Sequence, residues 1–155
     1  MSASASSACA VFAHCIWLDD TDRRRMAETG SAMSFCPTAN FVLGSALFDL
    51  LRVRELGVRV GLGTDVGAGT SFSMLQTMNE AYKVLHLAGQ SLSAESAFYL
   101  AALGGAHSLY LDDRIRNFSA GKEADFVVLH PQATPLLARR SAACTTLAER
   151  LFVLM

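Results

Sequence analysis

The sequence is poor in charge, and neither sign is in excess. Charged residues make up 17% of the chain, and 13 Lys and Arg oppose 14 Asp and Glu, for a net charge of -1. The longest basic run, Arg23 to Arg25, suits the solvated face of a helix. Proteins that bind nucleic acids or anionic membranes carry larger positive patches. We therefore expect no nucleic-acid partner and no membrane partner.

Cysteine pairs, long apolar runs and a secretory signal are also missing. The four cysteines stand at positions 9, 15, 36 and 144 and form no Cys-x-x-Cys pair, which favours free thiols in a reducing compartment. No apolar run reaches the ~18 residues of a membrane span, and no basic segment precedes the first apolar one. These features predict a cytoplasmic protein whose Ser/Ala-rich residues 1–9 form a disordered leader.

The sequence is rich in apolar residues, which make up 52% of the chain. Apolar runs of strand length begin near positions 10, 31 and 58, and a helical pattern follows each of them. This alternation is typical of an α/β protein with a parallel sheet, whose strands are buried on both faces. The first helix is expected over "DDTDRRRMAET", which has acidic residues first and Gly30 as its stop.

The other segments complete this prediction. Residues "PTANFVLGS" are expected to form a loop, and Ser45 is expected to cap a helix over "ALFDLLRVREL" that Gly57 ends. A longer helix is predicted between Ser71 and Gly89, and a helical pair is predicted after a cap at Ser93. The remainder predicts a turn-rich segment, the strand "DFVVL" and a helical tail over "TTLAERLFVLM".

Polar side chains stand where the three predicted strands end. His14 follows the first strand, and Asp65 follows the third within a loop framed by glycines. Cys36 and Asn40 follow the second strand. Because the carboxyl ends of parallel strands meet at one edge of a sheet, we expect these residues to converge there. An imidazole and a carboxylate suit a divalent metal and the proton of its water, and a metal-bound aspartate needs no basic neighbour.

Each of these residues also has a structural interpretation. Asp65 could cap the following turn, His14 could be a packed core residue, and Cys36 could be either a buried thiol or a pocket-lining one. Because Gly61 and Gly63 have no side chains, we interpret them as leaving room on the inner face of their strand for a ligand or metal. The pairing of His14 with Asp65 at matching strand ends favours the metal site.

Two blocks of sequence resemble a known family. The segments "AHCIWLDDTDRRRMAETGSAMSFCPTANFVLGSALFDL" and "GVRVGLGTDVGAGTSFSMLQTMNEAYKV" are similar to the C-terminal half of guanine deaminases, in the amidohydrolase superfamily of metal-dependent barrel hydrolases. "AALGGAHSLYLDD" and "GKEADFVVL" resemble the wider superfamily. The implied fold is α/β, with the last three strand-helix units of a (β/α)8 TIM-type barrel at 10–110. The start of a small C-terminal β region and a truncated helical tail would follow at 111–155.

The resemblance also implies a reaction. His14 matches the histidine that ends the sixth barrel strand and Asp65 matches the eighth-strand aspartate, so both are implied as catalytic and metal-binding residues. Cys36 and Asn40 are assigned to substrate binding. The implied cofactor is zinc, and the implied reaction is hydrolysis of guanine, or a related purine, to xanthine and ammonia in purine catabolism. The full-length form is expected to be a homodimer.

Parts of the family pattern are missing. The family's His-x-His metal pair occurs nowhere in the sequence, so the zinc ligand set is incomplete, and Arg116 stands where the family has glycine. Because a complete barrel takes about 250 residues, we interpret the chain as a fragment that is inactive alone and self-associates through uncovered apolar faces. Two alternatives stay open: a non-catalytic truncated product or interaction module, and an amidohydrolase acting on another aminated or chlorinated ring.

Overall fold

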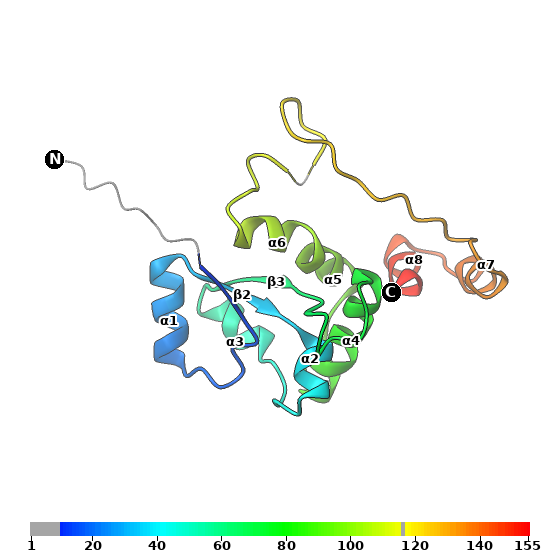
Figure 1. The fold of residues 1–155 in the computed structure, drawn as a ribbon. Helices are drawn as coiled ribbons and strands as arrows, with labels where there is room; N and C mark the ends of the chain where they lie inside the picture. The colour runs from blue at the N-terminus through cyan, green and yellow to red at the C-terminus, as the bar shows by residue number, and fades with distance from the viewer. Residues whose placement is uncertain (1–9, 116) are drawn as a thin grey trace.

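A computed structural model describes residues 10–115 and 117–155 and has a parallel sheet at its centre (Figure 1). The expected leader at residues 1–9 and Arg116 lie outside the described residues. The elements are β1 (Val11–Ala13), α1 (Asp20–Thr29), β2 (Ala32–Phe35), α2 (Pro37–Val42), α3 (Leu50–Glu55), β3 (Arg59–Leu62), α4 (Met74–Leu87), α5 (Ala94–Ala101), α6 (Leu103–Ser108), α7 (Pro135–Ala142) and α8 (Leu147–Leu154).

The three predicted strands are confirmed, and they pair in parallel in the order β1-β2-β3. The register places Val11 beside Ala32 and Ser34 beside Gly61. The central strand β2 is almost completely buried, as expected, but β1 is exposed along its length. The expectation of burial on both faces is wrong for β1, because it is an edge strand with no further strand beside it in the described part of the chain.

Helices pack around β3. Helices α5 and α6 approach this strand from above in the view of Figure 1, whereas α3 and α4 contact it from below. Helices α7 and α8 pack on each other, and α8 also contacts α5. None of the helices in the described ranges is long and apolar enough to cross a bilayer.

Local sequence explains where most helices begin and end. Asp19 and Asp22 form a reciprocal capping box at the start of α1, and Gly30 ends it with φ 69°. The Ser73 hydroxyl accepts a hydrogen bond from the backbone N–H of Gln76 at the start of α4. Ser93 caps α5 in the same way, as predicted.

Two segments near the second strand differ from the prediction. The expected loop after Cys36 begins with a short helix, α2, because Pro37 occupies its first position, where no backbone N–H is needed. The helix expected to start after Ser45 starts only at Leu50. Ala46 has a left-handed backbone with φ 83°, which a helix does not accommodate, and the Asp49 side chain caps α3 instead.

The strand expected over "DFVVL" is not formed. Residues 123–130 carry no regular structure, and Val127 and Val128 are 83% and 80% exposed. Figure 1 shows this segment as an extended arm between α6 and α7. A strand needs a neighbour for its backbone N–H and C=O groups, and no described strand lies beside the arm. The tail helix is confirmed as α8, α7 was not predicted, and the division at 110/111 stays a prediction.

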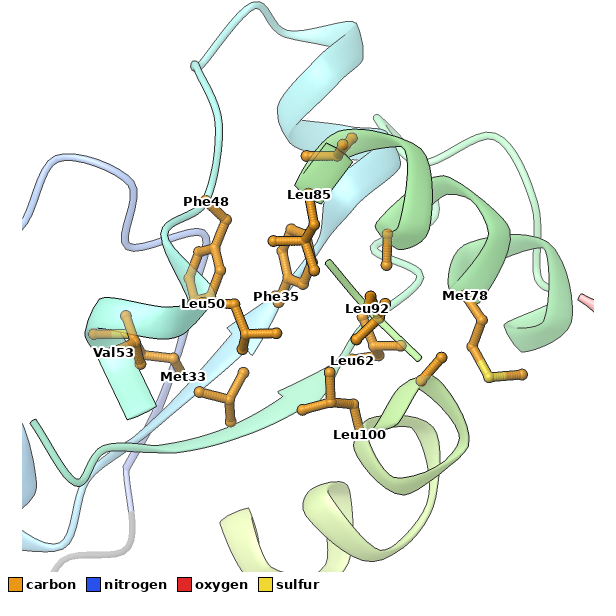
Figure 2. Packing of buried hydrophobic residues seen from close by; sticks show 14 of the residues in the cluster. Met33, Phe35, Phe48, Leu50, Val53, Leu62, Met78, Leu85, Leu92 and Leu100 are labelled. Carbon is orange, nitrogen blue, oxygen red and sulfur yellow. The ribbon is translucent and has the colours of Figure 1, made fainter. Parts of the chain in front are cut away.

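The hydrophobic core lies between the sheet and the helices α3, α4 and α5 (Figure 2). The rings of Phe35 and Phe48 stack with their centroids 4.6 Å apart. Phe35 comes from the central strand and Phe48 from the segment before α3, so the stacked rings connect the sheet to that segment. Both side chains are at most 1% exposed.

The helix α6 lies unusually close to β3 because glycines face each other at the contact. A Cβ on Gly61 would lie 3.0 Å from the Cα of Gly105, and a Cβ on Gly104 would lie 2.7 Å from the carbonyl oxygen of Val60. The interpretation of Gly61 as room for a ligand or metal is therefore wrong, because this space is filled by α6. Gly63, in contrast, does lie at the carboxyl edge, beside Ser34 and Cys36.

This contact predicts opposite effects for two neighbouring glycines. Gly104→Ala should lower the free energy of unfolding by about 1–3 kcal/mol, because the new methyl group overlaps the Val60 carbonyl. Gly105→Ala should leave it unchanged or raise it by up to about 1 kcal/mol, because a Cβ there meets no atom within 4 Å and alanine favours helix. Urea denaturation of both variants measures the difference. Equal midpoints would contradict the close contact.

Candidate metal centre

His14 lies directly after β1 at the carboxyl edge of the sheet. Its backbone N–H donates to the Ser34 carbonyl at 3.1 Å, which extends the β1–β2 pairing by one residue. Its backbone then turns into the left-handed region with φ 66°. The ring Nδ1 lies 2.6 Å from the Asn40 side-chain oxygen. Since that oxygen can only accept, Nδ1 carries the proton and Nε2 faces away from Asn40.

Asp65 lies in the loop after β3, at the same edge. Its backbone is also left-handed, with φ 48°, and its carbonyl accepts a 2.7 Å hydrogen bond from the Gly69 N–H. Its Oδ2 lies 3.6 Å from His14 Nε2, and both side chains are 39% exposed. The expected convergence of these residues is therefore present. Over the described ranges no backbone N–H donates to the Asp65 carboxylate, which disfavours the interpretation of Asp65 as a cap.

Cys36 is the third potential ligand at this edge. One ligand atom each from His14, Cys36 and Asp65 can be chosen so that all three lie within 4.8 Å of one another. The Cys36 side chain is 2% exposed, and its thiol donates to the Ser34 carbonyl at 3.5 Å. Burial raises the pKa of the Cys36 thiol, a contact with the Ser34 hydroxyl opposes this, and the negative charge of Asp65 adds to the rise.

The facing atoms of His14 and Asp65 suit a cation. When the ring carries its proton on Nδ1 alone, the lone pair of Nε2 faces the Asp65 carboxylate. Two lone pairs at 3.6 Å repel unless a proton or a cation lies between them. In a tetrahedral zinc site with bonds of ~2.0–2.3 Å, neighbouring ligand atoms are separated by roughly 3.3–3.7 Å. The residues present therefore fit a divalent metal.

Sequence reasoning missed one part of this arrangement. Asn40, assigned to substrate binding, is 1% exposed and contacts His14 across 26 residues of sequence. Its Nδ2 is buried without a hydrogen-bond partner. The only signal in the sequence was the place of Asn40 just after the second strand, which does not reveal the contact. Its role in substrate binding stays a prediction, and so does that of Cys36.

Two cavities of the structure lie away from this cluster. One, of about 470 Å³, is at the amino end of β3 and is lined by Arg59, His107 and Asp112 among others. Another, of about 620 Å³, lies between α5 and α8 and includes Tyr82 and Phe152. Active sites of parallel α/β proteins lie at the carboxyl ends of the strands. We therefore place the candidate centre at the open carboxyl edge rather than in either cavity.

Comparison with known proteins shows the family of this chain. Residues 2–151 match the amidohydrolase family. The chain belongs to the amidohydrolase family. This amidohydrolase chain is 58% identical to a guanine deaminase from Escherichia coli over 145 aligned residues. The alignment covers 94% of this chain and 33% of the E. coli protein. It thus spans about a third of the length of the curated relatives it matches.

Solved structures show the same fold as this amidohydrolase chain. The E. coli guanine deaminase superimposes with a TM-score of 0.90 over 92% of this chain and 34% of that one, at 58% identity. A Clostridium acetobutylicum guanine deaminase with bound guanine gives 0.58 at 29% identity, covering 63% and 25%. A Xanthomonas campestris adenosine deaminase with bound zinc gives 0.79 at 25% identity, covering 92% and 32%. The similarity supports an α/β fold of partial-barrel type.

Proposed function

We propose that this chain supplies part of a zinc-dependent site that hydrolyses guanine to xanthine and ammonia. The observation that carries the proposal is the 3.6 Å approach of His14 Nε2 and Asp65 Oδ2 in a chain similar to guanine deaminases. In this reaction a water oxygen bonds to the ring carbon, the bond from that carbon to the exocyclic nitrogen breaks, and protons from water pass to the leaving amine. The chain's own residues are suited to binding and proton transfer.

His14 and Asp65 would act together at the carboxyl edge. A bound zinc ion would supply Lewis acidity to water and substrate there. Asp65 offers one carboxylate oxygen as a ligand and the other as an acceptor for a proton from the attacking water. His14, whose Nδ1–H is held by Asn40, presents Nε2 to the same space as a ligand or proton acceptor. Both side chains are partly exposed, so a substrate can reach them.

Cys36 and Asn40 are proposed to influence substrate binding. Both side chains are at most 2% exposed. Their effect on guanine would therefore pass largely through the groups they contact, which are His14 for Asn40 and Ser34 for Cys36. A role in purine catabolism, a cytoplasmic location and a homodimeric full-length form belong to the same proposal.

A chimeric enzyme tests the function. We would replace the matching segment of the E. coli guanine deaminase with this chain and measure xanthine formation and bound zinc. The chimera is expected to deaminate guanine with roughly one zinc ion per chain. The isolated chain should show no enzymatic turnover, because His14, Cys36 and Asp65 alone leave most of a substrate site unformed.

The unmodified E. coli enzyme is the matched control, and a panel of other aminated and chlorinated rings is measured beside guanine. A folded, zinc-loaded chimera that does not deaminate guanine would refute the proposal. If the chimera converts another ring faster than guanine, that ring replaces guanine as the proposed substrate. Robust guanine turnover by the isolated chain would show that the site is complete without further residues.

A further inference from the structure

We propose that the cavity at the amino end of β3 binds a nucleotide-like metabolite, with Arg54 and Arg59 holding its phosphate and Tyr99 stacking on its planar ring. The cavity has a volume of about 470 Å³ and is lined by residues of α3, β3, α5 and α6. This volume lies within the roughly 300–1,000 Å³ of small-molecule sites. Because Asp65 follows the other end of β3, the cavity is separate from the candidate metal centre and does not depend on the proposed reaction.

A tight turn brings two arginines to this cavity. Arg54 lies in the last turn of α3, and Arg59 is the first residue of β3. Between them Gly57 has a left-handed backbone with φ 78°, and its N–H donates to the Arg54 carbonyl at 3.0 Å. The Val58 N–H donates to the Val53 carbonyl at 3.2 Å, which completes a Schellman motif. The motif reverses the chain after α3, so both arginines line the same cavity.

Both guanidinium groups can receive an anion. Arg54 and Arg59 are exposed, and no carboxylate oxygen of the described residues lies within 4.0 Å of either guanidinium. The neighbouring Arg52 differs, because it pairs with Asp20 and Glu55. A guanidinium offers N–H donors in one plane that match the oxygens of a phosphate. Two such groups balance the charge of about −1.5 to −2 that a phosphate monoester carries at pH 7.

Tyr110 holds one of the two arginines in place. The Cζ of Arg59 lies 3.9 Å from the centroid of the Tyr110 ring, in a cation–π contact. The Tyr110 hydroxyl donates to the Gly30 carbonyl at 2.7 Å, which fixes the ring against the end of α1. The stacked guanidinium keeps the N–H groups of its edge for a ligand. Part of the entropy cost of ordering Arg59 is therefore met before a ligand binds.

The one carboxylate in the lining is directed at an imidazole. Asp112 Oδ2 lies 3.4 Å from His107 Nε2, and His107 Nδ1 lies 3.2 Å from the Tyr99 hydroxyl. When the hydroxyl donates to Nδ1, the Nε2 proton faces Asp112. The two arginines therefore outweigh the single negative charge of Asp112, and the lining has a net positive charge.

Tyr99 offers a flat surface beside the arginines. Its side chain is 39% exposed and lines the cavity. A Cβ on Gly104 would lie 3.3 Å from Tyr99 Cε1, so the ring packs closely on α6, and the hydroxyl contact with His107 holds it there. Stacking of a base on an aromatic side chain tightens binding by about 5- to 150-fold. An aromatic ring next to two guanidinium groups thus favours a phosphate that carries a planar ring.

Isothermal titration calorimetry of the purified chain at low salt tests the site with three probes: adenosine monophosphate, adenosine and inorganic phosphate. Adenosine monophosphate is expected to bind at one site per chain with a Kd below about 1 mM. Adenosine should bind at least about tenfold more weakly, because it lacks the charged hydrogen bonds. Inorganic phosphate should bind about 5- to 150-fold more weakly than adenosine monophosphate, because it lacks the ring.

Variants assign the two parts of the ligand to residues. Arg54→Gln and Arg59→Gln should each raise the Kd for adenosine monophosphate at least about tenfold. Arg25→Gln is the matched control, since it removes the same charge from a side chain that is 74% exposed on α1, and it should change the Kd by less than about twofold. Tyr99→Leu should weaken only the nucleotide, whereas Tyr99→Phe, which keeps the ring, should stay within about threefold. Circular dichroism establishes that each variant is folded.

Four results would overturn the proposal. Absence of saturable binding of adenosine monophosphate would exclude the site. Equal affinities for adenosine and its monophosphate would exclude phosphate recognition, and equal affinities for inorganic phosphate and the nucleotide would exclude recognition of a ring. An equal loss of affinity in Arg25→Gln and the two cavity variants would show that the nucleotide pairs with surface charge in general. Binding is measured without turnover, so an inactive chimera would remove the proposed reaction and leave this site unaffected.

Discussion

Asp65→Asn in the chimera is expected to lower kcat/KM for guanine by about 10²- to 10⁴-fold, the usual range for loss of a catalytic base. Asparagine has nearly the shape of aspartate and also tolerates the left-handed backbone at this position, where φ is 48°. The substitution therefore removes the negative charge, an anionic ligand and a proton acceptor without disturbing the loop. Steady-state xanthine formation and bound zinc are the measurements.

Asp112→Asn is the matched control for this prediction. Asp112 also lies near a histidine, His107, at 3.4 Å, and its side chain is 39% exposed like that of Asp65. It lines the cavity at the amino end of β3, at the opposite end of the strand from Asp65. Its replacement should change kcat/KM by less than about threefold. An Asp65→Asn chimera that keeps its activity and its zinc would show that Asp65 has only a structural role.

Phe35→Ala is expected to lower the free energy of unfolding by about 3–5 kcal/mol. The Phe35 side chain is 0% exposed on the central strand and stacks on Phe48. Removing the ring deletes buried apolar contacts and leaves a cavity between the sheet and the segment before α3 (Figure 2). Because domains of this kind are stable by only about 5–15 kcal/mol, this one change should bring the chain close to unfolding.

Phe72→Ala serves as the control, since its side chain is 85% exposed. It should change the free energy of unfolding by less than about 0.5 kcal/mol. Urea denaturation followed by circular dichroism compares the two variants on the same chain. A Phe35→Ala midpoint equal to that of Phe72→Ala would mean that the stacked pair is not part of the stabilising core.

Features set by neighbouring residues could be predicted from the sequence. Ser93, whose partner lies three residues away, was predicted as a cap, and Gly30, which ends α1 by its own backbone preference, was predicted as a stop. Asp19 and Ser73 are caps of the same local kind that the prediction did not name. The convergence of His14 and Asp65 followed from one general rule, that parallel strands place their carboxyl ends at the same edge. The rule needs no knowledge of contacts between distant segments.

Features set by distant contacts could not be predicted. The hydrogen bond from His14 to Asn40 joins residues 26 apart, and the fit of Gly61 against Gly105 depends on how α6 lies on the sheet. The apolar run "DFVVL" has the composition of a strand, but a strand forms only beside a partner. The helix predicted to start after Ser45 starts only at Leu50, because Ala46 has a left-handed backbone and Asp49 caps α3 instead.

His14 and Asp65, the two facing residues of the candidate metal centre, both have a left-handed backbone that lowers the stability of the fold. A left-handed conformation is unfavourable for side chains with a Cβ, on the order of 1 kcal/mol per residue, and glycine avoids this strain. Glycine at either position would relieve this strain. The fold alone therefore does not require an imidazole and a carboxylate at these two strained positions.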